Sequence, residues 1–324
     1  MKKTFAGYYR PSEAEFADLW AKATFAIDAN VLLNFYGYSQ PTRNALIGIF
    51  ERLQDRLWLP HQFALEYQRN RPKAILEQLE NYKKVRKDLR RILDEHFRSR
   101  TRHPFVSKNS LASLEKISRQ LERGEREHAK LLTDDMFFQR ISEIFEDRVG
   151  SEPSLEDVSQ LQATAKDRYS RGCPPGFADK QKGEPGCYGD YIGWAQILRF
   201  ASEHGSDVIL VTDDRKEDWW LIRSDRTIGP RPELVSEFMS LTGRRFHMYS
   251  LDQFMVRARE YLGEKINANA LAEIRERSSE RREEDANQKP SPPKVDASKP
   301  SMMLTGGTTD PKPPSDNGQS AVRE

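Results

Sequence analysis

The chain alternates between short apolar runs and longer stretches in which apolar residues recur every three or four positions. The apolar runs predict short strands at residues 25–27, 56–60 and 207–212. The helical spacing predicts amphipathic helices at residues 13–23, 41–54, 61–71 and 190–205. Residues 245–263 predict one more strand and a final helix. Because strands and helices alternate, we expect an α/β domain with a mainly parallel central sheet.

The region of about residues 70–150 follows a different pattern. From Pro72 on, apolar residues up to Ile92 recur at spacings of three and four, and a second such stripe begins at Leu111. The region therefore predicts a long helical hairpin inserted into the α/β domain. Residues 151–189 are interrupted by Gly and Pro, so we expect mostly loop there.

The C-terminal part is predicted to lie outside the packed domain. No aromatic residue follows Tyr261, so we expect the core, and a domain of residues 1–262, to end near that point. Residues 263–287 are highly charged and predict a further helix. Residues 288–324 contain seven prolines and no aromatic residue. They are predicted to be a disordered tail, because they cannot bury enough apolar surface to offset the entropy lost on ordering.

Charge, cysteine content and the lack of long apolar stretches indicate which partners and which cellular compartment to expect. The net charge is +2, but residues 69–103 hold twelve Lys or Arg against five Asp or Glu. Such an excess can attract polyanions, and it equally suits a solvated helix face. Two cysteines are too few for a disulfide framework or a four-ligand zinc site. The chain opens with no signal-peptide pattern and has no apolar stretch of the roughly 20 residues that span a membrane. We therefore expect a cytoplasmic protein without membrane contact.

Acidic residues fall at one particular place on the predicted elements. Asp28 ends the first strand, and the pair Asp213 and Asp214 ends a later one. Glu66 lies just inside the helix after the second strand, and Asp190 opens another helix. In an open parallel sheet, the carboxyl ends of strands and the amino ends of the following helices share one edge. We therefore expect these carboxylates to meet there, although each alone is also typical of a helix cap or a solvated surface.

Carboxylates that gather in this way repel one another and raise each other's pKa values. A divalent cation neutralises such a cluster, and hard oxygen ligands suit Mg²⁺ or Mn²⁺. One or two such ions can polarise a phosphate and activate a water molecule. The pattern therefore favours metal-dependent hydrolysis of phosphate esters.

Four segments, in this order, resemble the acidic motifs of PIN-domain nucleases. They are FAIDANVLLNFY, LWLPHQFALEYQRNR, YGDYIGWAQILRFA and VILVTDDRKEDWW. The likeness covers residues 23–262 and is closest to the PIN-like subgroup with a long helical insertion and a downstream segment, present here at residues 229–254. It implies a three-layer α/β fold and an acidic active site that binds divalent metal.

The resemblance also assigns roles to residues of this sequence. Asp28, Glu66 and Asp190 match the first three acids of the family pattern. The last acid falls on Asp213 or Asp214, and Asp214 is favoured because relatives often place one residue between the Thr and the acid. These five residues are the predicted metal-binding set, and the predicted catalytic residues are Asp28, Glu66, Asp190 and Asp214.

Neighbouring polar residues are candidates for supporting roles. Asn30 resembles the small polar residue that follows the first aspartate by two and is expected to orient it beside the substrate. Lys180, Arg215 and Lys216 could hold phosphates, or only keep the loops solvated. Asp179 and Asp218 could support the metal ligands or join them.

We therefore expect a metal-dependent endonuclease that uses a metal-activated water, with RNA favoured over DNA as its nucleic-acid substrate. The alternative is a catalytically inactive PIN-like module that binds nucleic acid or protein. A scaffold role for the hairpin or the tail, with a protein partner, is a further alternative. The sequence leaves open the oligomeric state and the biological pathway.

Overall fold

The computed structural model describes residues 1, 4–97, 107–224, 226–264 and 267–288. It confirms the α/β class, with a four-stranded parallel sheet in the order β2–β1–β3–β6. The strands are short: β1 (Thr24–Ile27), β2 (Leu57–Trp58), β3 (Val208–Thr212) and β6 (Phe246–Ser250). Residues 289–324, nearly all of the predicted disordered tail, lie outside the described residues.

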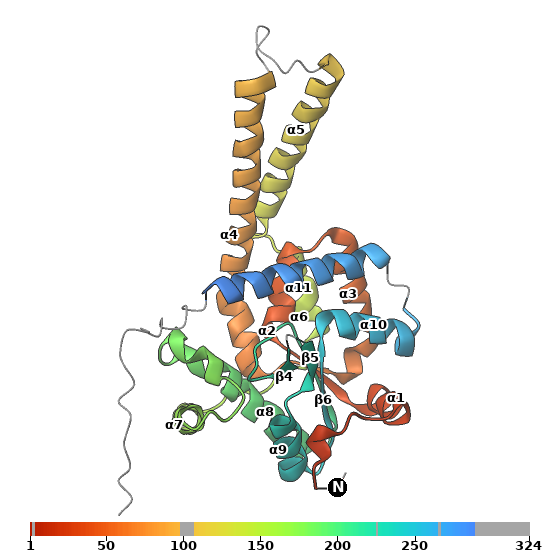
Figure 1. Ribbon diagram of the computed structural model, residues 1–324, viewed down its shortest axis with the longest axis vertical. Coiled ribbons are helices and arrows are strands. Elements are labelled where there is room, and N and C mark those ends of the chain that lie inside the picture. The colour runs from red at the N-terminus through yellow and green to blue at the C-terminus, as the bar shows by residue number, and fades with distance from the viewer. Residues whose placement is uncertain (2–3, 98–106, 225, 265–266, 289–324) are drawn as a thin grey trace, which may run out of the picture. The chain divides into compact units, whose positions relative to one another are not determined.

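Helices cover both faces of this sheet, as Figure 1 shows. The covering helices are α1 (Glu13–Lys22), α3 (Gln40–Leu53), α8 (Gly189–His204), α9 (Pro232–Thr242) and α10 (Leu251–Leu262). The strand register places Phe25 and Phe246 in successive rows, so their side chains point to opposite faces. The Phe25 ring lies 4.9 Å from Trp20 of α1, and the Phe246 ring lies 4.9 Å from Trp194 of α8. The three-layer arrangement follows from these two contacts.

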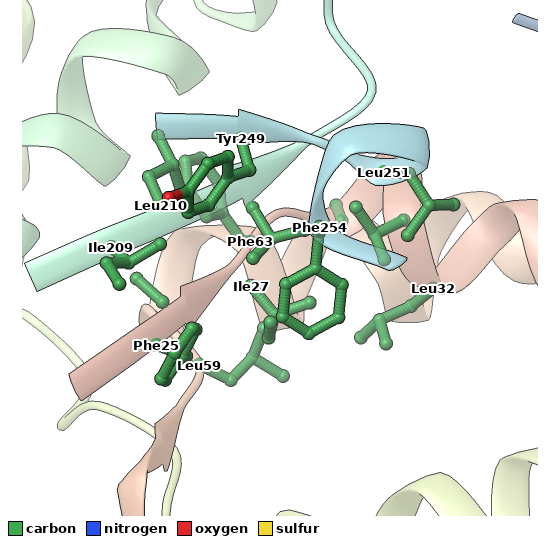
Figure 2. Close-up of a cluster of buried hydrophobic side chains, with 14 of the residues drawn as sticks. Phe25, Ile27, Leu32, Leu59, Phe63, Ile209, Leu210, Tyr249, Leu251 and Phe254 are labelled. Carbon is green, nitrogen blue, oxygen red and sulfur yellow. The ribbon is translucent and has the colours of Figure 1, made fainter. Parts of the chain in front are cut away.

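The core begins at the strands, because their residues are covered on both sides. All five residues of β3 are buried, as expected for a central parallel strand. Figure 2 shows Phe25, Ile27 and Leu59 from two adjacent strand regions packing toward Phe254 of α10. A rigid strand pair at this position can hold the polar residues that follow it in a defined place.

The predicted helical hairpin is present, and its first helix is longer than expected. The helix α4 (His61–Ile92) continues without a break through Pro72 and runs beside α5 (Lys108–Lys130) (Figure 1). A proline inside a helix removes one backbone hydrogen bond. Here Tyr67 before it and Ile75 after it belong to one buried stripe, and that shared packing keeps the helix continuous. Glu66 and the first half of the hairpin therefore belong to one continuous helix.

The prediction of loop for residues 151–189 is wrong for its first half, which forms α7 (Leu155–Ser170). Ser154 and Asp157 make a reciprocal capping box, which starts the helix despite its few apolar residues. Shorter elements complete this part of the fold: α2 (Ala29–Leu33), α6 (Met136–Ile144), and the antiparallel pair β4 (Trp220–Arg223) and β5 (Arg226–Pro230).

The core also extends beyond Tyr261, where it was expected to end. The helix α11 (Ala268–Gln288) buries Ala270 and Ile274, which are 2% and 0% exposed. Residues Met1–Glu283 form one compact unit. None of the described helices combines the length and apolar character needed to cross a bilayer.

Candidate active site

The ends of β1 and β3 place the first acidic residue. These strands are direct neighbours, with Ile27 opposite Val211, and the Asp28 amide donates a 3.0 Å hydrogen bond to the Val211 carbonyl. Asp28 then caps α2, and its Oδ2 accepts hydrogen bonds from Thr212 Oγ1 at 2.6 Å and Asn30 Nδ2 at 2.7 Å. The carboxylate is therefore held from the end of β3 and from α2.

Asn30 links Asp28 to the other strand end. Its Oδ1 accepts a 2.8 Å hydrogen bond from the backbone amide of Asp213, while its Nδ2 donates to Asp28. Both ends of the Asn30 amide are thus engaged within the protein. This geometry gives Asn30 the role of orienting Asp28.

The two consecutive aspartates after β3 have different surroundings. Asp213 accepts hydrogen bonds from Asn34 Nδ2 at 2.7 Å and from Ser278 Oγ of α11 at 2.9 Å. Asp214 Oδ2 lies 2.8 Å from the ammonium of Lys216. Asp213 is therefore built into the scaffold, and Asp214 faces the other acids.

Glu66 lies against Gly189 at the start of α8, next to Asp190 in the chain. Gln62, one turn earlier on α4, donates a 2.7 Å hydrogen bond to Glu66 Oε1. Gly189 opens α8, and a Cβ on that residue would come within 2.2 Å of Glu66 Oε1. The absence of a side chain at position 189 thus lets Glu66 approach the amino end of α8, where Asp190 lies.

Lys216 stands among three of the carboxylates. Its Nζ lies 2.8 Å from Asp214 Oδ2, 2.9 Å from Asp179 Oδ1 and 4.0 Å from Asp190 Oδ2. Two of the expected acids, Asp190 and Asp214, are therefore brought together with Asp179 around a lysine that the sequence suggests only as a phosphate contact. We call Asp28, Glu66, Asp190 and Asp214, with Asp179 and Lys216, the acidic cluster.

Burial and mutual repulsion raise the pKa values of acids in the acidic cluster. Burial raises the pKa of Asp28 to about 7, the hydrogen bond from Thr212 opposes the rise, and the charges of Glu66 and Asp214 add to it. Burial also raises the pKa of Glu66. The side chains concerned are thus close enough to feel one another, and two of them resist ionisation in the absence of added positive charge.

Asp190 and Asp179 show how unevenly the lysines neutralise the cluster. Burial raises the pKa of Asp190 well above its ordinary value, the Lys216 ammonium opposes the rise, and Asp214 adds to it. Burial would also raise the pKa of Asp179, but the charges of Lys216 and Lys182 outweigh it, so this pKa is lowered. Asp179 is therefore the neutralised acid of the group and Asp190 the unneutralised one.

The other candidate residues lie at the margin of the acidic cluster. Asp218 is fully buried, and its Oδ2 accepts hydrogen bonds from two backbone amides, Gly176 at 2.9 Å and Ala178 at 3.0 Å. Arg215 contacts Asp252 at 2.8 Å and is largely buried, so its guanidinium is used within the protein. Lys180 is exposed on a short helix of the same loop.

A groove of about 580 Å³ begins at the acidic cluster. Glu66, Asp179 and Asp190 line it at one side, and it follows α4 past Arg69 and Lys73. Cationic side chains also line it from other elements: Lys182 from the loop before α8 and Arg277 from α11. Charged groups of both signs line the groove.

A family model described as a PIN-like domain matches residues 24–234, which is more than half of the 324-residue chain. The chain belongs to the PIN-like domain family. The matched range contains every member of the acidic cluster. No curated protein and no solved structure matches the chain.

Membership in the PIN-like family supports a nuclease-type fold, and nucleases of this kind need oxygen ligands for a divalent cation. All the side-chain oxygens are hard ligands, and Asp190 Oδ2 and Asp218 Oδ1 are buried without a hydrogen-bond partner in the described part of the chain. Within that same part, no group of three acidic, His or Cys side chains is arranged as a metal site. The donors thus fit such an ion in kind, while Asp179 and Asp214 are oriented toward Lys216.

Some residues of this PIN-like site are not among those that the motifs predict. Thr212 holds both Asp28 and the backbone of Asp214, the latter at 2.9 Å. Gly189 makes room for Glu66, and Ser278 supports Asp213 from outside the matched range. A glycine directly before a predicted acid is the one local signal that could have pointed to position 189.

Proposed function

We propose that this protein is a metal-dependent nuclease that hydrolyses phosphodiester bonds of nucleic acid, with RNA as the favoured substrate. The observation that carries the proposal is the convergence of Asp28, Asp190 and Asp214 from three separate chain regions. Burial of these acids beside one another is unfavourable, and a purely structural role would not require it. Family membership supports the same reading at the level of the fold.

Each residue of the acidic cluster has a distinct proposed role. Asp28, Asp190 and Asp214 would hold Mg²⁺ or Mn²⁺, and Glu66 would bind the same ion or orient a water molecule. When bound, such an ion polarises a phosphate and makes a water molecule more acidic. Thr212 and Asn30 keep Asp28 in one orientation through their hydrogen bonds of 2.6 and 2.7 Å.

The groove along α4 is the proposed path of the nucleic-acid strand. Arg69 and Lys73 are exposed on α4, and Arg277 lines the groove from α11. Higher on the hairpin, Arg86 pairs with Glu125 of α5 at 3.2 Å and lies 3.8 Å from Glu122. The basic excess of residues 69–103 is therefore partly neutralised there, and the groove-lining residues at the base of α4 are the better phosphate ligands.

A cleavage panel tests the proposal. Single-stranded RNA, structured RNA and DNA would be incubated with the wild-type protein in Mg²⁺, Mn²⁺ or EDTA. We expect metal-dependent cleavage, strongest on RNA, and its loss in the double variant Asp28→Asn with Asp190→Asn. Asp55→Asn is the matched control, because the Asp55 side chain is fully exposed.

The alternative is a PIN-like module that binds nucleic acid without cleaving it. Retained RNA binding with no cleavage by the wild-type protein in any metal would favour that alternative. Cleavage that survives in the double variant would contradict the assignment of the acidic cluster as the active site.

A further inference from the structure

The Lys216 ammonium lies among the carboxylates of the acidic cluster. Its Nζ lies within 3 Å of both Asp214 and Asp179, on two different segments of the chain. It follows Asp214 by only two residues, and its own backbone amide donates a 2.8 Å hydrogen bond to Asp214 Oδ1. The main chain and the side chain of Lys216 thus hold the same carboxylate independently.

An ammonium group suits this position for a physical reason. It is a compact point charge with three donors, and it can therefore contact several carboxylates at once. A lysine side chain is ordinarily charged at neutral pH, and this one lies among three carboxylates, so the Lys216 ammonium is the internal counter-charge of the acidic cluster.

Lys216 does not neutralise the cluster completely. Asp190 Oδ2 is 4.0 Å from the ammonium, beyond hydrogen-bond distance, and is buried without a partner among the described residues. A larger or more central positive charge would satisfy oxygens that the lysine leaves unsatisfied. The carboxylates around Lys216 thus hold a cationic group of the protein itself and leave one buried oxygen without a partner among the described residues.

We propose that the Lys216 ammonium and a divalent cation compete for the oxygens of Asp214 and Asp190, so that Lys216 leaves the acidic cluster when metal binds. The inference rests on the proposed metal-dependent function. The 2.8 Å hydrogen bond from the Lys216 backbone amide can stay in place while the long side chain moves, so Asp214 keeps its position in both states. The released ammonium then carries positive charge beside the site, where a phosphate can meet it.

The first test measures metal affinity directly, by calorimetric titration of Mn²⁺ alone into the full chain. Lys216→Met removes the charge and keeps the length of the side chain, and we expect Mn²⁺ to bind about tenfold more tightly, or ~1.4 kcal/mol. Lys182→Met is the matched control. Lys182 contacts Asp179 from a more exposed position. This variant removes an equal charge nearby but leaves the Lys216 ammonium between Asp214 and Asp179, so its Mn²⁺ affinity should rise much less than that of Lys216→Met.

The second test follows the lysine itself and does not depend on the variant folding. Lysine side-chain amines labelled with ¹⁵N would be observed by NMR while Mg²⁺ alone is added to the wild-type protein. The Lys216 signal, identified by the slow exchange of its ammonium protons with water, should move toward the position of solvent-exposed lysines.

The outcomes separate this inference from the proposed function. Equal or weaker Mn²⁺ binding by Lys216→Met, equal tightening by Lys182→Met, or an unchanged Lys216 signal at saturating Mg²⁺ overturns the competition. If wild-type cleavage nevertheless requires Mn²⁺, the proposed function stands without it. If neither wild type nor variant binds a divalent cation, both fall.

Discussion

The side-chain amide of Asn34 donates a 2.7 Å hydrogen bond to Oδ2 of Asp213, and this contact separates the roles of the two consecutive aspartates. Ser278 occupies the other oxygen of Asp213 from α11. Asp214, one residue later, is turned toward Lys216 and the other acids. Of the two carboxylates that follow β3, Asp213 is thus bonded within the scaffold and Asp214 belongs to the acidic cluster.

The two aspartates should therefore respond differently to the same substitution. Asp214→Asn is expected to abolish metal-dependent cleavage and leave stability nearly unchanged. Asp213→Asn places an amide against the Asn34 amide, so it should lower the free energy of unfolding by about 1–3 kcal/mol. Urea unfolding and a cleavage assay, run on both variants, check this. A stable but inactive Asp213→Asn protein would reverse the assignment.

Gly189 is expected to control the position of Glu66. Gly189→Ala would bring a methyl group within 2.2 Å of Glu66 Oε1, so the carboxylate must move. We expect reduced cleavage with little loss of helix content, because alanine favours a helix over glycine. Gly48→Ala in α3 is the control, since the structure places nothing within 4 Å of its added methyl group. Equal activity of the two variants would show that Glu66 tolerates displacement.

The pKa of Asp28 predicts how stability depends on pH in the absence of metal. Because this pKa is raised from 3.8 to about 7, the folded protein keeps a proton that the unfolded chain has lost. This contribution is fully present below pH 3.8 and is lost as pH rises through about 7, by up to about 4 kcal/mol. Urea unfolding in EDTA across this range should show a flatter profile for Asp28→Asn. An unchanged profile would mean that Asp28 is ionised throughout.

The groove predicts where salt-dependent binding originates. Arg69→Ala combined with Lys73→Ala should weaken RNA binding and reduce the slope of log affinity against log salt by about 0.7 for each phosphate ion pair removed. Lys87→Ala combined with Arg90→Ala, higher on α4, removes the same charge outside the groove lining. An equal effect of the two pairs would extend the binding surface along the hairpin.

Ile274 predicts that α11 contributes to stability despite its polar composition. Ile274 is 0% exposed, so Ile274→Ala should lower the free energy of unfolding by about 2–5 kcal/mol. Leu155 is 88% exposed, and Leu155→Ala should change it by less than about 0.5 kcal/mol. Denaturant unfolding measures both. A small effect of Ile274→Ala would show that α11 packs only weakly.

The central sheet and the acids on its edge are predictable because their signals are local. Val208 to Thr212 form an unbroken β-favouring run, and the carboxylates of Asp213 and Asp214 follow at its end. Geometry common to all parallel sheets then brings Asp28 to the same edge. The separation of Asp213 from Asp214 was not predictable, because it depends on Asn34 and on Ser278, 65 residues downstream.

Where the sequence prediction fails, the deciding contacts come from residues far away in the chain. Two residues of α7, Ala165 and Tyr169, are buried, which is too few to produce a clear helical period. The sequence predicts α11 as a charged helix but does not reveal its two buried apolar positions, Ala270 and Ile274. Tertiary packing decides both cases. The position of Lys216 was not predictable for the same reason. Nothing in the sequence around a lysine in a polar loop indicates that three acids will surround it.

The hydrogen bond between Ser278 and Asp213 also determines when, during translation, the surroundings of Asp213 can be completed. The two residues are 65 positions apart. Ser278 therefore leaves the ribosome only after every residue of the acidic cluster has been synthesised. A chain that stops short of residue 278 cannot form this contact, whatever else of the sheet has folded. Translation itself thus delays the finished arrangement around β3 until α11 has emerged.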